Sequence, residues 1–217
     1  MTETNSDEAA RPQSPLHGTP PARTKSSSGE TRGVVVRERP WGLALQVIAR
    51  RGKVEAAAQA LHAAIGVEAP TAPRHVPGAD AAILWSGPSQ WLVLADASRA
   101  GTVSSRIETA ATGVAALIDQ SDGRIQLGMS GPRTRDALAK LVGIDVDPRV
   151  FPVGAAAMTV IAHIPVHIWR APDADGDPVF EIAGPRSYAG SLWHHVVVAA
   201  AEYGLQAITL DPTAACA

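Results

Sequence analysis

The densest group of polar side chains runs from Asp119 to Arg124 and has the sequence Asp-Gln-Ser-Asp-Gly-Arg. Two carboxylates beside a hydroxyl group are a combination that acid–base and nucleophilic catalysis can use. The sequence places no base next to Ser121, however, and Asp-Gly is a frequent turn dipeptide. The run also joins an apolar segment to an alternating one, so we interpret it as a structured turn between two strands.

The histidines are the only candidates for a metal site. His163 and His167 are four residues apart with a proline between them, and on a strand they would share a face. No carboxylate lies at a spacing typical of a third metal ligand, so we favour the interpretation that the two histidines are packed or face solvent. His194 and His195 are adjacent on a predicted helix and point about 100° apart, too far to chelate together. The single cysteine, Cys216, excludes an internal disulfide and cysteine-rich metal sites.

Composition excludes several classes of protein. Hydrophobic residues make up 46% of the 217 residues and charged residues 18%, which is enough for a real core. Lys and Arg total 19 against 21 Asp and Glu, so no basic surface is indicated for nucleic acid or for an anionic membrane. No apolar stretch reaches the length of about 20 residues that a transmembrane helix needs, and no signal peptide is apparent. We therefore expect a cytoplasmic protein with neither nucleic acid nor membrane as a partner.

The chain divides into a tail and a domain. Residues 1–33 are rich in proline, serine and charge and have almost no large apolar side chain. Such a segment buries too little surface to offset its ordering entropy, so we predict a disordered tail. Residues 34–217 are predicted to form a single α+β domain.

Two sets of elements are expected in this domain. In the first half, apolar residues alternate with polar or small ones in the predicted strands and recur at helical spacing in the predicted helices, which gives the order β-α-β-β-α-β. The ranges are strand 43–48, helix 54–65, strands 81–86 and 91–95, helix 103–113 and strand 114–118. The second half follows the order less cleanly, with a strand at 125–130, a helix between Pro132 and Gly143, strands 158–164, 166–170 and 179–182, and a helix over 192–204. Two ferredoxin-like halves packed together fit this pattern.

Two arginines and two tryptophans are candidate partner contacts. Arg133 and Arg186 each follow a Gly-Pro pair at the start of a predicted helix, where a positive charge opposes the helix dipole. We take them as candidates to face an acidic group on a partner; the alternative is a solvated side chain or a salt bridge inside the fold. Trp41 and Trp169 lie near segment ends and are candidate interface anchors, a role in which tryptophan is enriched.

Several stretches occur together in an order that resembles one family, the gamma subunit of heterotetrameric sarcosine oxidase. The resemblance covers roughly residues 40–205. The stretches are Ser-Gly-Pro-Ser-Gln-Trp-Leu-Val-Leu at 86–94, Asp-Gln-Ser-Asp-Gly-Arg at 119–124, Ser-Gly-Pro-Arg at 130–133, Ile-Asp-Val-Asp-Pro-Arg-Val-Phe-Pro-Val-Gly at 144–154 and Arg-Ser-Tyr-Ala at 186–189.

The resemblance implies a fold and a role. The fold would be related to the folate-binding aminomethyltransferase domain of the glycine cleavage T protein. The complex would oxidatively demethylate sarcosine to glycine, releasing hydrogen peroxide and formaldehyde or 5,10-methylenetetrahydrofolate. FAD, FMN, NAD and tetrahydrofolate would bind the alpha and beta subunits, and zinc the delta subunit. This chain would hold no cofactor and would act as a non-catalytic partner, chiefly of the alpha subunit.

Two alternatives remain open from the sequence. One is a free-standing folate-binding protein of the aminomethyltransferase type, in which Asp119 or Asp122 would supply the acid. The other is a scaffold for a different oxidase or demethylase, acting on another N-methyl amino acid.

Overall fold

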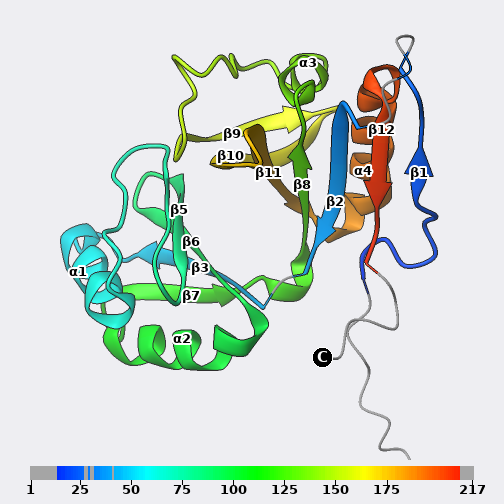
Figure 1. Ribbon diagram of the computed structural model, residues 1–217. Helices are drawn as coiled ribbons and strands as arrows, with labels where there is room; N and C mark the ends of the chain where they lie inside the picture. Colours follow the sequence, from blue (N-terminus) through cyan, green and yellow to red (C-terminus); the bar gives the residue numbers. More distant parts are fainter. Residues whose placement is uncertain (1–13, 27–28, 30–31, 41, 211–217) are drawn as a thin grey trace, which may run out of the picture.

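The computed structural model describes residues 14–26, 29, 32–40 and 42–210. Within these residues the chain forms two β-sheets, each covered on one face by two α-helices (Figure 1). The uncovered faces of the two sheets pack against each other, so the protein is α+β as expected. No helix among the described residues has both the length and the apolar character to cross a bilayer.

The N-terminal sheet is built from one continuous stretch of sequence. Its strand order is β4-β5-β6-β3-β7, with antiparallel neighbours throughout. The elements in chain order are β3 (Leu43–Ala49), α1 (Val54–Ile65), β4 (His75–Val76), β5 (Ala82–Gly87), β6 (Gln90–Ala95), α2 (Ala97–Ala110) and β7 (Ala115–Asp119). Apart from the two-residue β4, this is the predicted order β-α-β-β-α-β.

Alternation along the strands decides which residues meet the two helices. Leu43, Leu45 and Val47 point toward α1 and α2 and join a core with Leu61 and Ile107. The first helix ends where expected, at Gly66, whose φ of 69° is a left-handed conformation that favours glycine.

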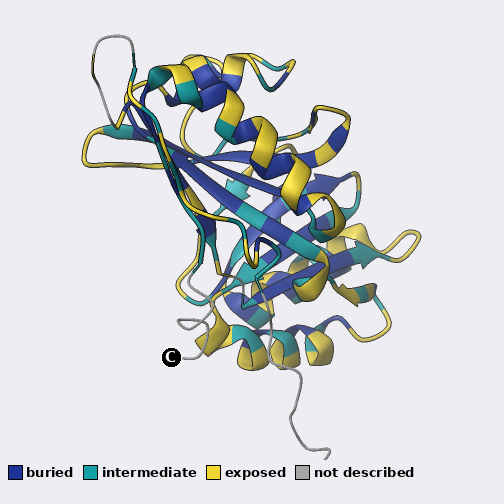
Figure 2. Cartoon of the chain, turned by 90° about the vertical axis from the view of Figure 1, so that its right-hand side faces the viewer, coloured by how far each residue is buried: buried dark blue, intermediate teal, exposed yellow. Residues whose placement is uncertain are grey.

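The C-terminal sheet has the strand order β1-β12-β2-β8-β11-β10-β9. Its elements are β1 (Ala22–Arg23), β2 (Val34–Arg39), β8 (Arg124–Ser130), α3 (Thr134–Ala139), β9 (Ala156–Ile161), β10 (Ile164–Ala174), β11 (Asp177–Pro185), α4 (Ala189–Ala200) and β12 (Leu205–Ile208), with short 3₁₀ turns η1 (Ser121–Gly123), η2 (Arg186–Tyr188) and η3 (Ala201–Tyr203). Helices α3 and α4 cover one face, and Figure 2 shows their outer sides exposed over buried strands.

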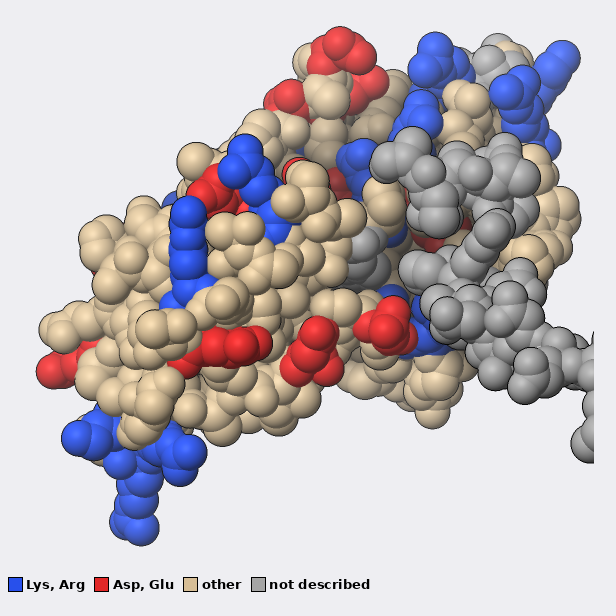
Figure 3. All heavy atoms as spheres, turned by 90° about the horizontal axis from the view of Figure 1, so that it is seen from below, with Lys and Arg blue, Asp and Glu red and all other residues tan. Residues whose placement is uncertain are grey.

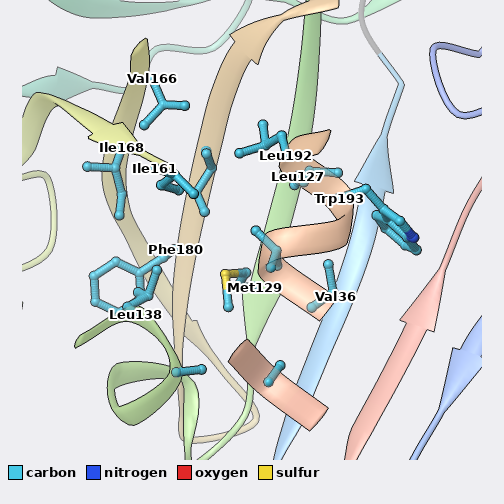
Figure 4. Packing of buried hydrophobic residues seen from close by; sticks show 14 of the residues in the cluster. Val36, Leu127, Met129, Leu138, Ile161, Val166, Ile168, Phe180, Leu192 and Trp193 are labelled. Atoms are coloured by element: carbon cyan, nitrogen blue, oxygen red, sulfur yellow. The ribbon is translucent and has the colours of Figure 1, made fainter. Parts of the chain in front are cut away.

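The main core lies between this sheet and its two helices (Figure 4). Leu127, Met129 and Phe180 project from the central strands toward Leu138 of α3 and Leu192 of α4, and all five side chains are fully buried. Large apolar residues of this kind contribute about 1.5–3 kcal/mol each when buried. This core holds the two helices against one face of the sheet. The opposite face of the sheet packs against the N-terminal sheet.

The C-terminal half departs from a simple repeat of the N-terminal half. Strand β2 precedes the N-terminal sheet in sequence, yet it lies between β8 and β12 and runs parallel to β12. Strands β2 and β12 were not predicted, because each is short and is stabilised by a partner far away in the sequence. Helix α3 is also shorter than the predicted helix between Pro132 and Gly143.

Part of the predicted disordered tail is ordered in the structure, which corrects that prediction for residues 14–26. Leu16 is only 2% exposed and packs into the main core, and β1 pairs with β12. Glu38 accepts hydrogen bonds from Ser14 Oγ at 2.5 Å and from the backbone N–H of Leu210 at 3.0 Å. One buried leucine and an edge-strand pairing thus stabilise a segment whose composition alone indicated disorder. Residues 1–13, 27–28 and 30–31 of the predicted tail, and Cys216, lie outside the described residues.

Candidate functional site

The two sheets meet along a narrow contact that we call the seam. Its apolar centre consists of Leu84 and Leu92 from the N-terminal sheet and Trp169 from β10, together with Ala44, Ala156 and Ala183. Residues of the same parity on β8, β10 and β11 continue along the seam in both directions from this centre. These positions carry polar and ionisable side chains, so the seam has two chemically different ends.

At one end, which we call the acid end, a buried carboxylate is fully partnered. Glu181 Oε1 accepts a hydrogen bond from Arg39 Nη2 at 2.9 Å, and Glu181 Oε2 accepts one from Gln126 Nε2 at 2.8 Å. Burial raises the pKa of Glu181 although the Arg39 charge opposes the shift. The His75 ring stacks on Trp169 with centroids 5.5 Å apart, and burial lowers the pKa of His75 to about 4. A cavity of about 330 Å³ opens here.

At the other end, which we call the base end, a histidine joins the two sheets. His167 Nε2 lies 3.0 Å from Ser86 Oγ, and Arg124 Nη1 lies 3.4 Å from His167 Nδ1. Because the guanidinium can only donate, Nδ1 accepts, and the Nε2 proton points to Ser86. Burial, and then the Arg124 charge, lower the pKa of His167 to about 4, so the ring is neutral at pH 7. Gln120 Oε1 accepts from Arg124 Nε at 2.7 Å.

A cavity of about 460 Å³ opens from the base end to the surface. Arg124, Gln120 and His167 form its polar part, and most of the remaining lining is apolar: Met158, Val160, Pro165, Val166 and Pro185. Met158 and Val160 are each 53% exposed, and both belong to β9, the last strand of the sheet. The base end is therefore a half-buried positive charge within an open apolar rim.

The pairing of Ser86 with His167 does not make a hydrolase. In a serine–histidine–acid triad a carboxylate behind the imidazole stabilises the imidazolium that forms when serine loses its proton. Here burial, and then the charge of Arg124 behind the imidazole, lower the pKa of His167 and disfavour the imidazolium. The arrangement suits the binding of an anion better than the abstraction of a proton.

The polar run that opened the sequence analysis forms the predicted turn. Asp119 Oδ1 accepts from the Ser121 N–H at 2.8 Å and from Ser121 Oγ at 2.6 Å, and the backbone N–H of Ala44 donates to Ser121 Oγ. Asp119 and Asp122 are exposed. Two residues of the run, Gln120 and Arg124, reach the base end of the seam.

The candidate histidines do not gather into a metal site. His163 is exposed in the turn between β9 and β10, whereas His167 is buried in the seam. In the part of the chain that the structure describes, no three potential ligands among His, Cys, Asp and Glu lie together.

The candidate partner contacts fall in different places. Arg133 is exposed, donates to Asp136 Oδ2 at 2.5 Å and lies 5.0 Å from the Tyr203 ring centre, so it forms a salt bridge inside the fold. Arg186 begins η2, directly after Pro185 of the cavity wall. Trp169 is 3% exposed and packs between the two sheets of the seam, so its burial within the chain disfavours the predicted partner contact, which stays a prediction. Trp41 lies outside the described residues.

Sequence reasoning missed the joint role of Ser86, Arg124 and His167. A signal was present, since His167 shares parity with Trp169 in the otherwise apolar stretch 164–169. A histidine two residues from a buried tryptophan on the same strand face is placed in the same environment.

This arrangement, two helix-backed sheets packed across a seam, is the fold of an aminomethyltransferase-type protein. The glycine cleavage system aminomethyltransferase T from Bartonella henselae matches it with a TM-score of 0.61 over 85% of this chain and 48% of that one, at 16% identity. A heterotetrameric sarcosine oxidase from Corynebacterium sp. U-96, solved in complex with pyrrole 2-carboxylate, matches with a TM-score of 0.69 over 80% of this chain and 87% of that one, at 27% identity.

The sequence comparisons identify the family. Residues 51–202 match the model of the sarcosine oxidase, gamma subunit family. The sarcosine oxidase subunit gamma of Arthrobacter sp. is 35% identical over 146 residues, which cover 66% of this chain and 71% of the relative. That of Corynebacterium sp. (strain P-1) is 30% identical over 191 residues, covering 84% and 88%. The chain belongs to the sarcosine oxidase gamma subunit family, as its sequence motifs indicated.

Proposed function

We propose that this chain is a non-catalytic, structural subunit of a cytoplasmic heterotetrameric sarcosine oxidase. The assembled enzyme oxidatively demethylates sarcosine to glycine, with hydrogen peroxide and formaldehyde or 5,10-methylenetetrahydrofolate as the other products. FAD, FMN, NAD, tetrahydrofolate and zinc belong to the alpha, beta and delta subunits in this proposal. The contribution of this chain is to bury surface of its partners, chiefly of the alpha subunit.

The apolar rim on β9 carries this proposal. A strand at the edge of a sheet has unpaired backbone groups, and soluble proteins protect such edges with charges, prolines or a covering segment. Here Met158 and Val160 face outward, and Thr159 between them adds no charge. Exposed apolar patches beside a cavity mark sites of association, so β9 has the properties of a surface that a partner covers. Figure 3 shows both signs of charge on the face of the molecule viewed from below, as on an ordinary solvated surface.

Arg133 and Arg186 are proposed as additional contacts. Arg186 is the better placed of the two, because η2 adjoins the cavity wall at Pro185 and its third residue, Tyr188, is half-exposed. Arg133 would have to exchange its salt bridge with Asp136 for one with a partner. Replacing each by Glu tests the two contacts separately: weaker assembly supports a contact, and unchanged assembly removes it.

Co-expression tests the subunit role directly. The tagged chain is produced together with the alpha, beta and delta subunits encoded in the same genome, and the purified material is scanned for flavin absorbance. We expect stoichiometric co-purification with flavin-bearing subunits. A chain that remains monodisperse alone and never co-purifies with them would contradict the proposal.

A free-standing folate-binding protein is the second candidate, and the similarity to the aminomethyltransferase fold favours it. Asp119, one of its two candidate acids, is engaged in the turn with Ser121. Titration of the isolated chain with tetrahydrofolate distinguishes the two functions, since tight one-to-one binding would support the second and exclude a purely structural role.

A further inference from the structure

The half-buried charge at the base end has no described carboxylate to balance it. The contacts of Arg124 are the neutral Gln120 amide and the neutral His167 ring, and burial lowers its pKa with no acidic neighbour opposing the shift. A guanidinium has five N–H donors, so these two contacts leave others without an acceptor among the described residues, and the side chain lines the cavity. A second donor without a partner lies further inside the seam. Gln46 of β3 accepts from Ser86 Oγ through its Oε1 at 3.5 Å, and its Nε2 is buried without an acceptor among the described residues.

Two other arginines on the same sheet each form a salt bridge with a carboxylate. Arg170 is buried and pairs with Asp173, and Arg39 at the acid end pairs with Glu181. Buried charges in proteins are normally paired, since desolvation of an isolated ion is costly. By this comparison Arg124 lacks, among the described residues, the anionic partner that Arg39 and Arg170 each have.

We propose that the cavity at the base end receives an Asp or Glu side chain of a partner subunit, which pairs with Arg124 while apolar residues on both sides of it cover Met158 and Val160. This inference rests on the proposed function, because it specifies how the subunit is held. Charge complementarity selects the acid, and the planar guanidinium offers it a bidentate geometry. The half-exposed rim on β9 selects a protein segment, because a small anion would leave that apolar surface uncovered.

The neutral state of His167 fits this arrangement. Its Nε2 proton is used within the chain by Ser86, so the ring adds no second positive charge that would demand a second anion. One carboxylate therefore balances the site. Glu181, Arg39 and His75 also face the seam, but they lie at its acid end and are engaged there.

The first test removes the charge within the assembled complex. The dissociation constant of the wild-type chain for its co-expressed partner subunits is compared with that of Arg124→Gln. Arg149→Gln serves as control, because Arg149 is exposed and forms a salt bridge with nearby Asp147. We expect Arg124→Gln to bind about 30-fold more weakly or worse, with a flatter dependence on salt concentration, and the control to resemble the wild type.

The second test does not touch the buried network and so avoids a folding defect. Met158→Asp and Met158→Lys remove the same apolar side chain from the exposed rim and place opposite charges at that position. An incoming carboxylate predicts that Met158→Asp binds at least about tenfold more weakly than Met158→Lys. Equal affinities for these two variants would overturn the proposal, as would wild-type affinity and salt dependence in a folded Arg124→Gln.

Two further outcomes are distinguishable. If the wild-type chain does not assemble with the flavin-bearing subunits, the proposed function fails and this inference fails with it. If the wild type assembles, Arg124→Gln assembles equally well, and benzoate raises the melting temperature of the isolated wild-type chain but not of Arg124→Gln, the site takes a small carboxylate and the docking proposal is wrong.

Discussion

The two ends of the seam differ in how a buried or half-buried charge is balanced. At the acid end a buried carboxylate has an arginine and an amide as partners, and the contacts are complete within the chain. At the base end a half-buried guanidinium has only neutral partners within the described part of the chain and lines an open cavity. A complete set of contacts indicates a structural role, whereas an incomplete set within an apolar rim indicates that something from outside completes it.

The largest expected effect comes from the centre that both ends share. Trp169→Ala removes the largest side chain of the seam and leaves a cavity between the sheets, which should cost about 3–5 kcal/mol in the free energy of unfolding. Chemical denaturation of the isolated chain measures it, with Val160→Ala on the exposed rim as a control expected within about 0.5 kcal/mol of wild type. Unchanged stability combined with failed assembly would restore Trp169 as an interface anchor.

A smaller effect is the dependence of stability on pH. The pKa of His167 is about 4 in the folded chain against 6.5 for an unperturbed histidine, so between these values the unfolded state binds more protons. The free energy of unfolding should therefore fall as pH drops from 6.5 to 4, by about 3 kcal/mol from this ring alone. The raised pKa of Glu181 acts in the opposite sense, since ionising that carboxyl costs stability as pH rises above 4.5.

Substitution of His167 by Asn isolates its share of this slope. The control is His163→Asn, an exposed turn position whose φ of 70° asparagine tolerates. We expect the slope between pH 6.5 and 4 to flatten in the first variant only. An identical slope in both variants would show that the folded pKa of His167 is not depressed.

The smallest effect concerns the balance of charge at the acid end. Arg39→Gln leaves Glu181 with one hydrogen-bond donor and should cost about 1–2 kcal/mol at pH 7, a reduced figure because the Arg39 side chain is 42% exposed. The double variant Arg39→Gln with Glu181→Gln should recover most of this loss, because no charge is then buried. Denaturation of the four chains of this double-mutant cycle measures the coupling, and additive losses would contradict it.

The parts of the fold that local pattern determines were predictable. Alternation in β3 and helical spacing ending at Gly66 were enough to predict the order of elements around the N-terminal sheet. That sheet is built from one continuous stretch of sequence, so local patterns describe most of it. Strand β2 and its parallel neighbour β12 were missed, since Leu205 pairs with Val34 across almost the whole chain. No local signal specifies such a partner.

The site was less accessible to sequence reasoning for the same reason. His167 was grouped with His163 by spacing, but its actual partner is Ser86, 81 residues earlier and in the other sheet. Arg124 was recognised only as the end of a turn, and its burial depends on how the two sheets pack. The chemistry of a seam becomes visible only when both of its faces are in place.

The tie between the first and last described segments has a consequence during synthesis. The N-terminal sheet, residues 43–119, is complete in one stretch and can form as soon as that stretch has left the ribosome. Segment β1 emerges earlier, but its partner β12 is translated after every other described strand, as is Leu210, which donates to Glu38 of β2. The nascent chain therefore carries a finished first sheet while β1 still lacks its partner strand, and the second sheet closes only once β12 has been translated.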